Sequence, residues 1–157
     1  MPFIGIITDE DKENCIRRRI LEKLNLRESS VLFIKEKSIE NIKNIKFETI
    51  LLDREFKNID MLKLILKNVK YLIVNSDIIS NLSILDNLEI TVITYGFNSK
   101  ATITASSVDE EETLICIQRN IVNNQGKNIE PQEIKMKIEK DVDCEMAISA
   151  ILLIYEK

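Results

Sequence analysis

Short apolar runs alternate with segments of helical periodicity over the first 94 residues, and this alternation limits the possible folds more than any other feature of the chain. The apolar runs predict five strands, at residues 3–7, 30–34, 49–52, 71–74 and 90–94. The segments between them predict four helices, at residues 11–24, 38–45, 58–69 and 78–85. The predicted strands are mostly apolar runs, which is typical of strands that helices cover on both faces. We therefore expect an α/β fold in three layers, with a mostly parallel sheet between helices.

The pattern changes after Gly96, where the sequence predicts an antiparallel meander in place of further βα units. Residues 101–106 alternate small polar and apolar side chains, and residues 113–122 and 129–138 are typical of two more strands. The loop between these two contains Gly126, where a hairpin adopts a positive φ easily. Along residues 134–138 apolar side chains alternate with lysines, so one face of this strand should be wet. Residues 142–155 predict a C-terminal helix that is apolar nearly all round and packs against a sheet.

The length of 157 residues predicts a single domain spanning residues 1–157. No apolar run approaches the roughly 20 residues of a membrane helix, and the first residues lack the basic and apolar regions of a secretory signal. Three widely spaced cysteines are typical of reduced thiols, so we expect a cytoplasmic protein without a membrane partner. The net charge of −4 argues against nucleic acid as a partner. The lack of histidine removes the commonest general base and metal ligand.

Several strings from residue 71 onward carry a resemblance to a known family. They are residues 71–77 (YLIVNSD), 92–98 (VITYGFN), 101–105 (ATITA) and 142–150 (VDCEMAISA). Together with the order of elements, they resemble the central ATP-binding domain of the Mur ligases and, less closely, the folylpolyglutamate synthases. The resemblance covers nearly the whole chain and implies the same parallel sheet, antiparallel meander and closing helix. A flavodoxin-like or receiver-like domain is the alternative fold, and the antiparallel part argues against it.

The phosphate-binding loop of that family is missing from this sequence. The family's first strand leads into Gly-x-x-Gly-x-x-Gly-Lys-Thr, which cradles phosphates with backbone N–H groups, a lysine and a Mg²⁺-binding hydroxyl. In the ungapped alignment with residues 5–13 (GIITDEDKE), only Gly5 and Lys12 match. Carboxylates stand where a polyanion would bind, and each repels a phosphate charge by roughly 1 kcal/mol at about 4 Å even in bulk water. We therefore expect no ATP cofactor. The carboxylates are Asp9, Glu10, Asp11 and Glu13.

The same four carboxylates have two other interpretations. Acidic side chains in the first turn of a helix are favoured by the helix dipole, and Thr8 with Asp11, or Asp9 alone, would cap that helix. The alternative is a cation site built from the carboxylates. The family's histidine, modified lysine and acidic Mg²⁺ ligand have no equivalent, because only residues 53–70 lie where the family carries them. We therefore expect neither a metal ligand nor a catalytic residue.

Three residues remain as candidate contacts of a residual nucleotide site, namely Lys12, Asn75 and Asp77. Asn75 and Asp77 lie at the end of a predicted parallel strand, and ligands gather at the carboxyl ends of such strands. The resemblance to the Mur ligases implies a position near the base and the ribose. The alternative is an Asx turn that caps the next helix.

Other polar side chains also have a structural and a functional interpretation. Residues 17–19 (RRR) form either a solvated helix face with packed stems or a site for phosphate or an acidic partner. Arg119 either pairs with Glu130 or Glu133 across the predicted hairpin or belongs to a partner-binding face. Cys15 and Cys144 are expected to be buried as small apolar side chains rather than to act as nucleophiles.

These observations predict a non-catalytic domain, a binding or scaffolding module whose partner is an unknown protein or a second copy of the chain. One alternative is a nucleotide-binding enzyme or sensor that uses the strand ends around Asn75 and Asp77 instead of a phosphate loop. Another is a homo-oligomer that pairs through its antiparallel part.

Overall fold

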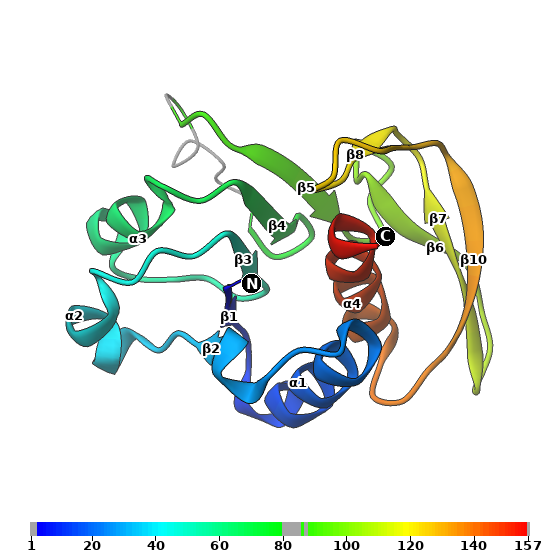
Figure 1. Ribbon diagram of the computed structural model, residues 1–157. Helices are drawn as coiled ribbons and strands as arrows, with labels where there is room; N and C mark the ends of the chain where they lie inside the picture. The colour runs from blue at the N-terminus through cyan, green and yellow to red at the C-terminus, as the bar shows by residue number, and fades with distance from the viewer. Residues whose placement is uncertain (1–2, 80–85, 87, 157) are drawn as a thin grey trace.

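The computed structural model describes residues 3–79, 86 and 88–156. Within them, eight strands form one sheet in the order β10-β7-β6-β5-β4-β3-β1-β2 (Figure 1). The parallel strands are β1 (Ile4–Ile7), β2 (Val31–Phe33), β3 (Thr49–Leu52), β4 (Tyr71–Asn75) and β5 (Thr91–Tyr95). The antiparallel extension consists of β6 (Ile103–Val108), β7 (Glu112–Ile117) and β10 (Gln132–Lys137), and β6 joins the end of β5 in parallel. The predicted α/β class, with a mostly parallel sheet followed by an antiparallel meander, is confirmed.

Helices cover both faces of the parallel strands (Figure 1). α1 (Glu10–Leu24) and α4 (Val142–Tyr155) lie on one face, and α2 (Ile39–Ile42) and α3 (Ile59–Leu66) lie on the other. Because successive strand residues point to opposite faces, Leu51 packs under α1 and α4, whereas Ile50 and Leu52 pack under α2 and α3. The central strands need apolar side chains on both faces, which explains the mostly apolar runs in the sequence.

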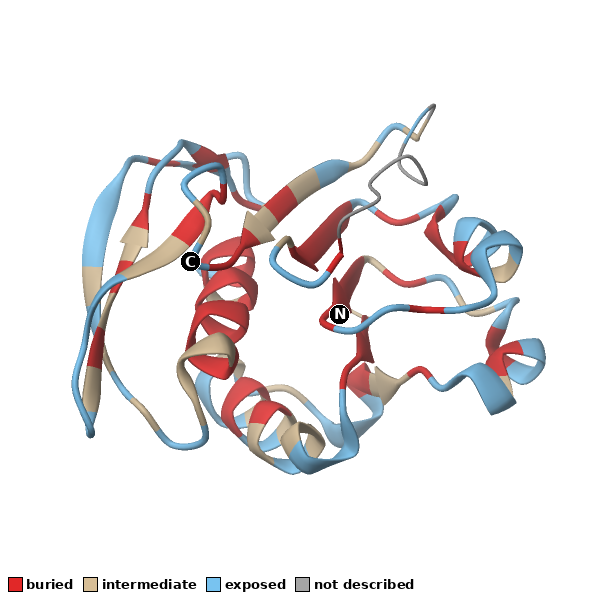
Figure 2. Cartoon of the chain, turned by 180° about the vertical axis from the view of Figure 1, so that it is seen from behind, coloured by how far each residue is buried: buried red, intermediate tan, exposed pale blue. Residues whose placement is uncertain are grey.

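The C-terminal helix α4 is the centre of the larger core and begins and ends where the sequence predicts (Figure 2). Its first turn is capped by Asp141, whose side chain accepts a hydrogen bond of 2.8 Å from the backbone N–H of Cys144. The helix packs between α1 and strands β4 to β8, so most of its side chains are buried. Each fully buried isoleucine here contributes roughly 1.5–3 kcal/mol relative to an exposed one.

The antiparallel part differs from the sequence prediction in one respect. The two runs expected at residues 113–122 and 129–138 are each broken in two, and the inner pieces β8 (Ile121–Val122) and β9 (Asn128–Ile129) form a separate two-stranded hairpin. Pro131 separates β9 from β10, and a proline has no backbone N–H to donate to a ladder. The lysines of β10 are exposed and its apolar residues half-buried, which confirms the predicted wet face.

The helix expected at residues 38–45 is also shorter than predicted. Only Ile39–Ile42 is α-helical, and the Ser38 hydroxyl donates to the carbonyl of Lys35 at 3.2 Å instead of capping the helix. From residue 80 onward, the helix expected at residues 78–85 lies outside the described residues. No helix in the part of the chain that the structure describes is long and apolar enough to cross a membrane. All three cysteines are free thiols.

Candidate functional site

A row of four buried side chains crosses the carboxyl edge of the parallel sheet. The strand register places the residues that follow β1 and β3 beside the last residues of β4 and β5. No more than 7% of any of these residues is exposed. The four are Thr8, Asp53, Asn75 and Tyr95.

Asp53 is the centre of this row and accepts a hydrogen bond from each of its other three side chains. Its Oδ2 accepts from the Thr8 hydroxyl at 2.6 Å and from Lys12 Nζ at 3.4 Å. Its Oδ1 accepts from the Asn75 side-chain amide at 3.2 Å and from the Tyr95 hydroxyl. A carboxylate has about four acceptor positions, and a buried one is costly unless they are used. We call these five residues the Asp53 cluster, in which every acceptor position already has a donor.

The electrostatic balance of the Asp53 cluster is acidic. Burial favours the neutral amine of Lys12, but the carboxylates of Asp53 and of the first turn of α4 outweigh it and hold the pKa of Lys12 above its ordinary value. Burial, reinforced by Asp53, raises the pKa of Tyr95 well above its ordinary value, so the hydroxyl stays protonated and donates. Burial and nearby carboxylates raise the pKa of Asp143 as well, although Lys12 opposes them. One cation therefore stands among several carboxylates, which is unfavourable for a phosphate.

Asp77 belongs to a separate cluster that ties two loops together. Its carboxylate accepts from the backbone N–H groups of Phe97 at 2.7 Å and Asn98 at 3.3 Å, and from the Asn98 side-chain amide at 2.7 Å. Partial burial raises the pKa of Asp77, but these hydrogen bonds outweigh it and lower the pKa below its ordinary value. Asn75 Oδ1 accepts from the Asp77 N–H at 3.1 Å, as the predicted Asx turn requires. Of the three candidate residues, Lys12 and Asn75 therefore meet at Asp53, whereas Asp77 does not.

Gly96 allows Asp77 to approach the loop that follows β5. Its substitution should show how much this contact contributes to the free energy of unfolding. Gly96 has a φ of +153°, and an added Cβ would lie 2.6 Å from Asp77 Oδ1. We expect Gly96→Ala to lower the free energy of unfolding by about 2 kcal/mol, measured by chemical denaturation, because the alanine is both strained and in contact. Gly126→Ala is the matched control, since Gly126 also has a positive φ, +78°, but no atom within 4 Å of an added Cβ. Equal losses in the two variants would contradict the importance of the contact.

The connection between β1 and α1 is too short for a phosphate-binding loop. It contains only Thr8 and Asp9, because α1 begins at Glu10. A backbone that surrounds a phosphate needs a longer Gly-rich turn. Gly5 lies inside β1 instead, where an added Cβ would approach Ile34 Cδ1 to 2.7 Å. The glycine that matches the family motif is thus required by core packing in this chain.

The four carboxylates around the start of α1 are each bound by a cation from another segment. Lys35 pairs with Glu10 at 3.1 Å and with Glu13 at 3.2 Å. Arg54 pairs with Asp9 and Lys140 pairs with Asp11, each at 3.7 Å. Three of the carboxylates lie in the first turn, as the helix-dipole interpretation predicts. The capping prediction is wrong, because the Thr8 hydroxyl binds Asp53 and Asp9 makes no side-chain cap.

Around the Asp53 cluster, the described part of the chain contains a small cavity and no arranged set of metal ligands. Within residues 3–79, 86 and 88–156, no group of three His, Cys, Asp or Glu residues is arranged to hold a metal ion. A cavity of about 250 Å³ among the ion pairs of α1 is lined by Thr8 but not by Asp53. Ligand pockets usually measure roughly 300–1,000 Å³, so this one is small for a nucleotide.

The three arginines of α1 are not the uniform solvated face expected from the sequence. Arg19 is only 8% exposed and forms an ion pair through both oxygens of Glu145, which is fully buried in α4. Arg18 pairs with Glu139, and the guanidinium of Arg17 lies 4.6 Å from the centre of the Phe33 ring. The run therefore joins α1 to three other segments.

Two smaller predictions from the sequence have different outcomes. The expected cross-strand pair of Arg119 is wrong, because Arg119 forms no ion pair with any described residue and Glu133 lies opposite Cys116. Cys144 is buried as expected, whereas Cys15 is half-buried. Burial raises the pKa of both thiols, which makes them poor nucleophiles.

Sequence reasoning missed Asp53, Tyr95 and Glu145 as members of polar clusters. Asp53 had a usable signal, because it is a carboxylate directly after a buried strand and its neighbours Thr8 and Asn75 end neighbouring strands. Glu145 had no such signal, since its partner Arg19 lies 126 residues away in the sequence.

Comparisons with known proteins identify no family for this chain. No family model matches the chain, and no curated protein matches it either.

Proposed function

We propose that this chain is a non-catalytic domain, similar in design to the central domain of the Mur ligases, that acts as a binding or scaffolding module. The observation that carries the proposal is the position of Lys12, the residue that would bind phosphates in that family. Its amine lies 3.4 Å from the buried carboxylate of Asp53, and only 12% of its side chain is exposed. A phosphate would have to displace this largely buried ion pair in order to reach the amine.

Two further features support the loss of nucleotide chemistry. The two-residue connection between β1 and α1 offers no ring of free backbone N–H groups for an anion. Besides Asp53, the carboxylates of Asp141 and Asp143 at the start of α4 act on Lys12 and help to raise its pKa, so the surroundings of the amine are acidic. Both features disfavour the binding of polyphosphate ligands. Neither of them involves the outer surface, where a macromolecular partner could bind.

The alternative, a nucleotide site around Asn75 and Asp77, has less support. Asn75 is 1% exposed, and its side chain is used on both sides, by Asp53 and by the Asp77 N–H. The Asp77 carboxylate accepts three hydrogen bonds from Phe97 and Asn98. A ribose hydroxyl would therefore have to compete with internal hydrogen bonds at both residues.

A titration with ATP and Mg²⁺ tests the proposal directly. We expect isothermal titration calorimetry to show no binding up to about 1 mM ATP, and thermal unfolding to be unchanged by the nucleotide, because bound ligand would raise the midpoint. Lys12→Ala is the matched variant. It should also show no binding of ATP and no change of its own unfolding midpoint when the nucleotide is added. Micromolar binding that Lys12→Ala abolishes would overturn the proposal, and binding that Asn75→Ala abolishes would favour the alternative.

A further inference from the structure

The strand β10 forms a free edge of the sheet and is long enough to pair with another strand. It has six residues and is bonded on one side only, to β7, whereas the opposite edge strand β2 has three. No proline or bulge interrupts β10, although such features often protect edges. An edge of this kind presents unpaired N–H and C=O groups that a further strand can bind.

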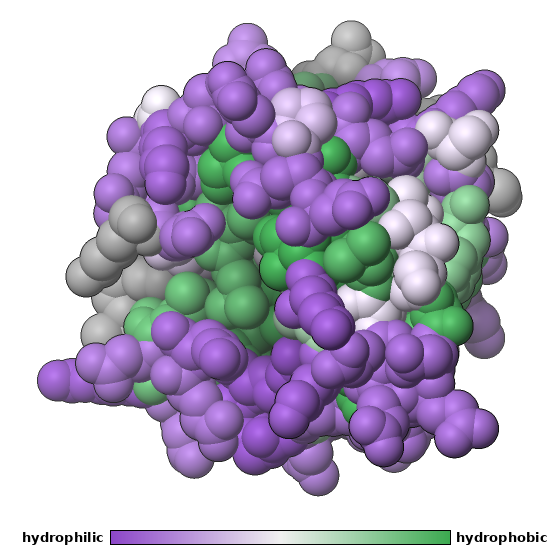
Figure 3. Space-filling model, turned by 90° about the vertical axis from the view of Figure 1, so that its right-hand side faces the viewer, coloured by the Kyte–Doolittle hydropathy of each residue, from purple (hydrophilic) through white to green (hydrophobic). Residues whose placement is uncertain are grey.

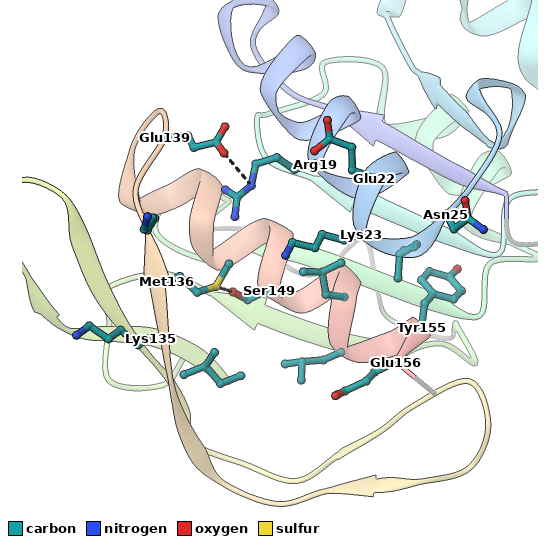
Figure 4. A pocket seen from close by; sticks show the side chains of 15 residues that line it. Arg19, Glu22, Lys23, Asn25, Lys135, Met136, Glu139, Ser149, Tyr155 and Glu156 are labelled. Carbon is teal, nitrogen blue, oxygen red and sulfur yellow. Dashed lines mark hydrogen bonds and ion pairs between the residues drawn. The ribbon is translucent and has the colours of Figure 1, made fainter.

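An apolar groove runs beside this edge. It measures about 820 Å³ and lies between β10, the C-terminal half of α1 and the C-terminal half of α4 (Figure 4). Its apolar lining comes from Leu24, Ile134, Met136, Leu152 and Leu153. Figure 3 shows apolar surface in a hollow on the side of the molecule that carries the antiparallel strands, with hydrophilic side chains around it. A strand added to β10 would lie over this groove.

The charges on the outer face of β10 match those of the same strand in reverse. Glu133, Lys135 and Lys137 alternate along this face and are all exposed. Lys135 is already bound by Glu112 of β7 at 3.0 Å. Glu133 accepts a hydrogen bond of 3.6 Å from the Cys116 thiol. Neither Glu133 nor Lys137 takes part in an ion pair with the residues that the structure describes, so each charge is available to a partner.

We propose that β10 pairs antiparallel with β10 of a second copy of this chain, about a twofold axis at Lys135. In this register Glu133 of each copy faces Lys137 of the other, and Ile134 faces Met136. Residues opposite each other in an antiparallel pair lie on the same face, so the charged pairs are outside and the apolar pairs are inside. A twofold axis makes every contact twice, which gives two ion pairs and two apolar pairs.

The groove supplies the rest of the interface. In the joined sheet, the inner side chains of the partner strand point to the same side as Ile134 and Met136, and hence over the groove. They cover Leu152 and Leu24, which are only partly buried in the single chain. The two Lys135 side chains meet at the axis, and their repulsion is offset because each is held by its own Glu112. The inference rests on the proposed binding role and names a second copy as the partner.

Charge reversal tests both the dimer and its register. We expect sedimentation equilibrium of the full chain to give twice the 18.2 kDa chain mass at micromolar concentration. Glu133→Lys and Lys137→Glu each turn two attractive pairs into two repulsive ones, so each should raise the dimer dissociation constant at least tenfold. The double variant Glu133→Lys/Lys137→Glu restores both pairs and should dimerise again. An equal mixture of the two single variants should form heterodimers for the same reason.

The outcomes separate this inference from its alternatives. Lys63→Glu, an exposed lysine on α3 at the opposite face, is the matched control and should leave the dimer intact. A wild-type chain that stays monomeric up to about 100 µM overturns the inference and assigns the groove to a different partner. A dimer that neither single reversal weakens pairs elsewhere and overturns it as well. The ATP titration does not depend on whether the chain dimerises. Nucleotide binding would therefore contradict the proposed function, whereas a monomer would contradict only the inference of a dimer.

Discussion

Replacing Glu145 with alanine should lower the free energy of unfolding by about 3–5 kcal/mol, the largest effect we expect from a single substitution. Glu145 is fully buried and binds the guanidinium of Arg19 through both oxygens. Its Oε1 also accepts from the backbone N–H of Glu139 at 3.3 Å. The alanine variant would leave a buried guanidinium without its main counter-ion, and desolvation of that charge is what destabilises the protein. Chemical denaturation followed by circular dichroism measures the loss.

Two further variants show whether the loss comes from the charge or from packing. Glu22→Ala removes an exposed carboxylate from α1, the helix that carries Arg19, and should leave the free energy of unfolding almost unchanged. The double variant Arg19→Met/Glu145→Leu removes both charges and fills the space with apolar atoms, so it should recover most of the loss. If the double variant is as unstable as Glu145→Ala, the ion pair itself rather than an uncompensated charge holds α1 to α4.

Replacing Asp53 with asparagine should lower the free energy of unfolding by about 3 kcal/mol, because its carboxylate is the common acceptor of four donors. Asparagine has nearly the same shape but one acceptor oxygen, and its NH₂ group would face the donors of Asn75 and Tyr95, or of Thr8 and Lys12. The buried amine of Lys12 would also lose its counter-ion. Urea denaturation of both proteins at the same pH gives the difference.

Whether Asp53→Asn lowers or raises the free energy of unfolding distinguishes a structural cluster from a ligand site. Residues that bind ligands are often kept at a cost in stability, so their removal is neutral or stabilising. A stabilised Asp53→Asn protein would therefore point to a functional site and count against the proposed non-catalytic role. Asp9→Asn is the control, since it removes a half-exposed carboxylate from the connection between β1 and α1, next to Thr8, and it should change the stability little.

Most elements of the fold could be predicted because each has a local cause. The apolar run at Thr49–Leu52 and the helix Val142–Tyr155 match the prediction at both ends. The strand is recognised by its apolar residues, which are buried on both faces of the sheet. The start of the helix is recognised by the capping aspartate before an apolar segment. The inner hairpin of β8 and β9 was missed, because each predicted strand runs across a short polar interruption, at residues 118–120 and at residues 130–131. Local periodicity does not specify where a strand leaves its sheet.

The candidate site was predicted only in part. Lys12 and Asn75 were identified because they belong to a motif position and a strand end, and both do lie at the same edge of the sheet. Asp77 was grouped with them because it is only two residues from Asn75, yet its carboxylate binds the loop after β5. The sequence cannot show which donors share an acceptor, since the strands that bring Thr8, Asp53 and Tyr95 together are far apart in the chain.

The sequence by itself determined the order of strands and helices, the change from parallel to antiparallel strands after Gly96, and the lack of a Gly-rich phosphate loop. All three follow from the types and spacing of neighbouring residues. Only the tertiary structure decided that Lys12 is bound to Asp53, that Arg19 is bound to Glu145, and that β10 is a free edge beside an apolar groove. These depend on distances between segments 41 to 126 residues apart, which the register of the sheet and the packing of α4 set together.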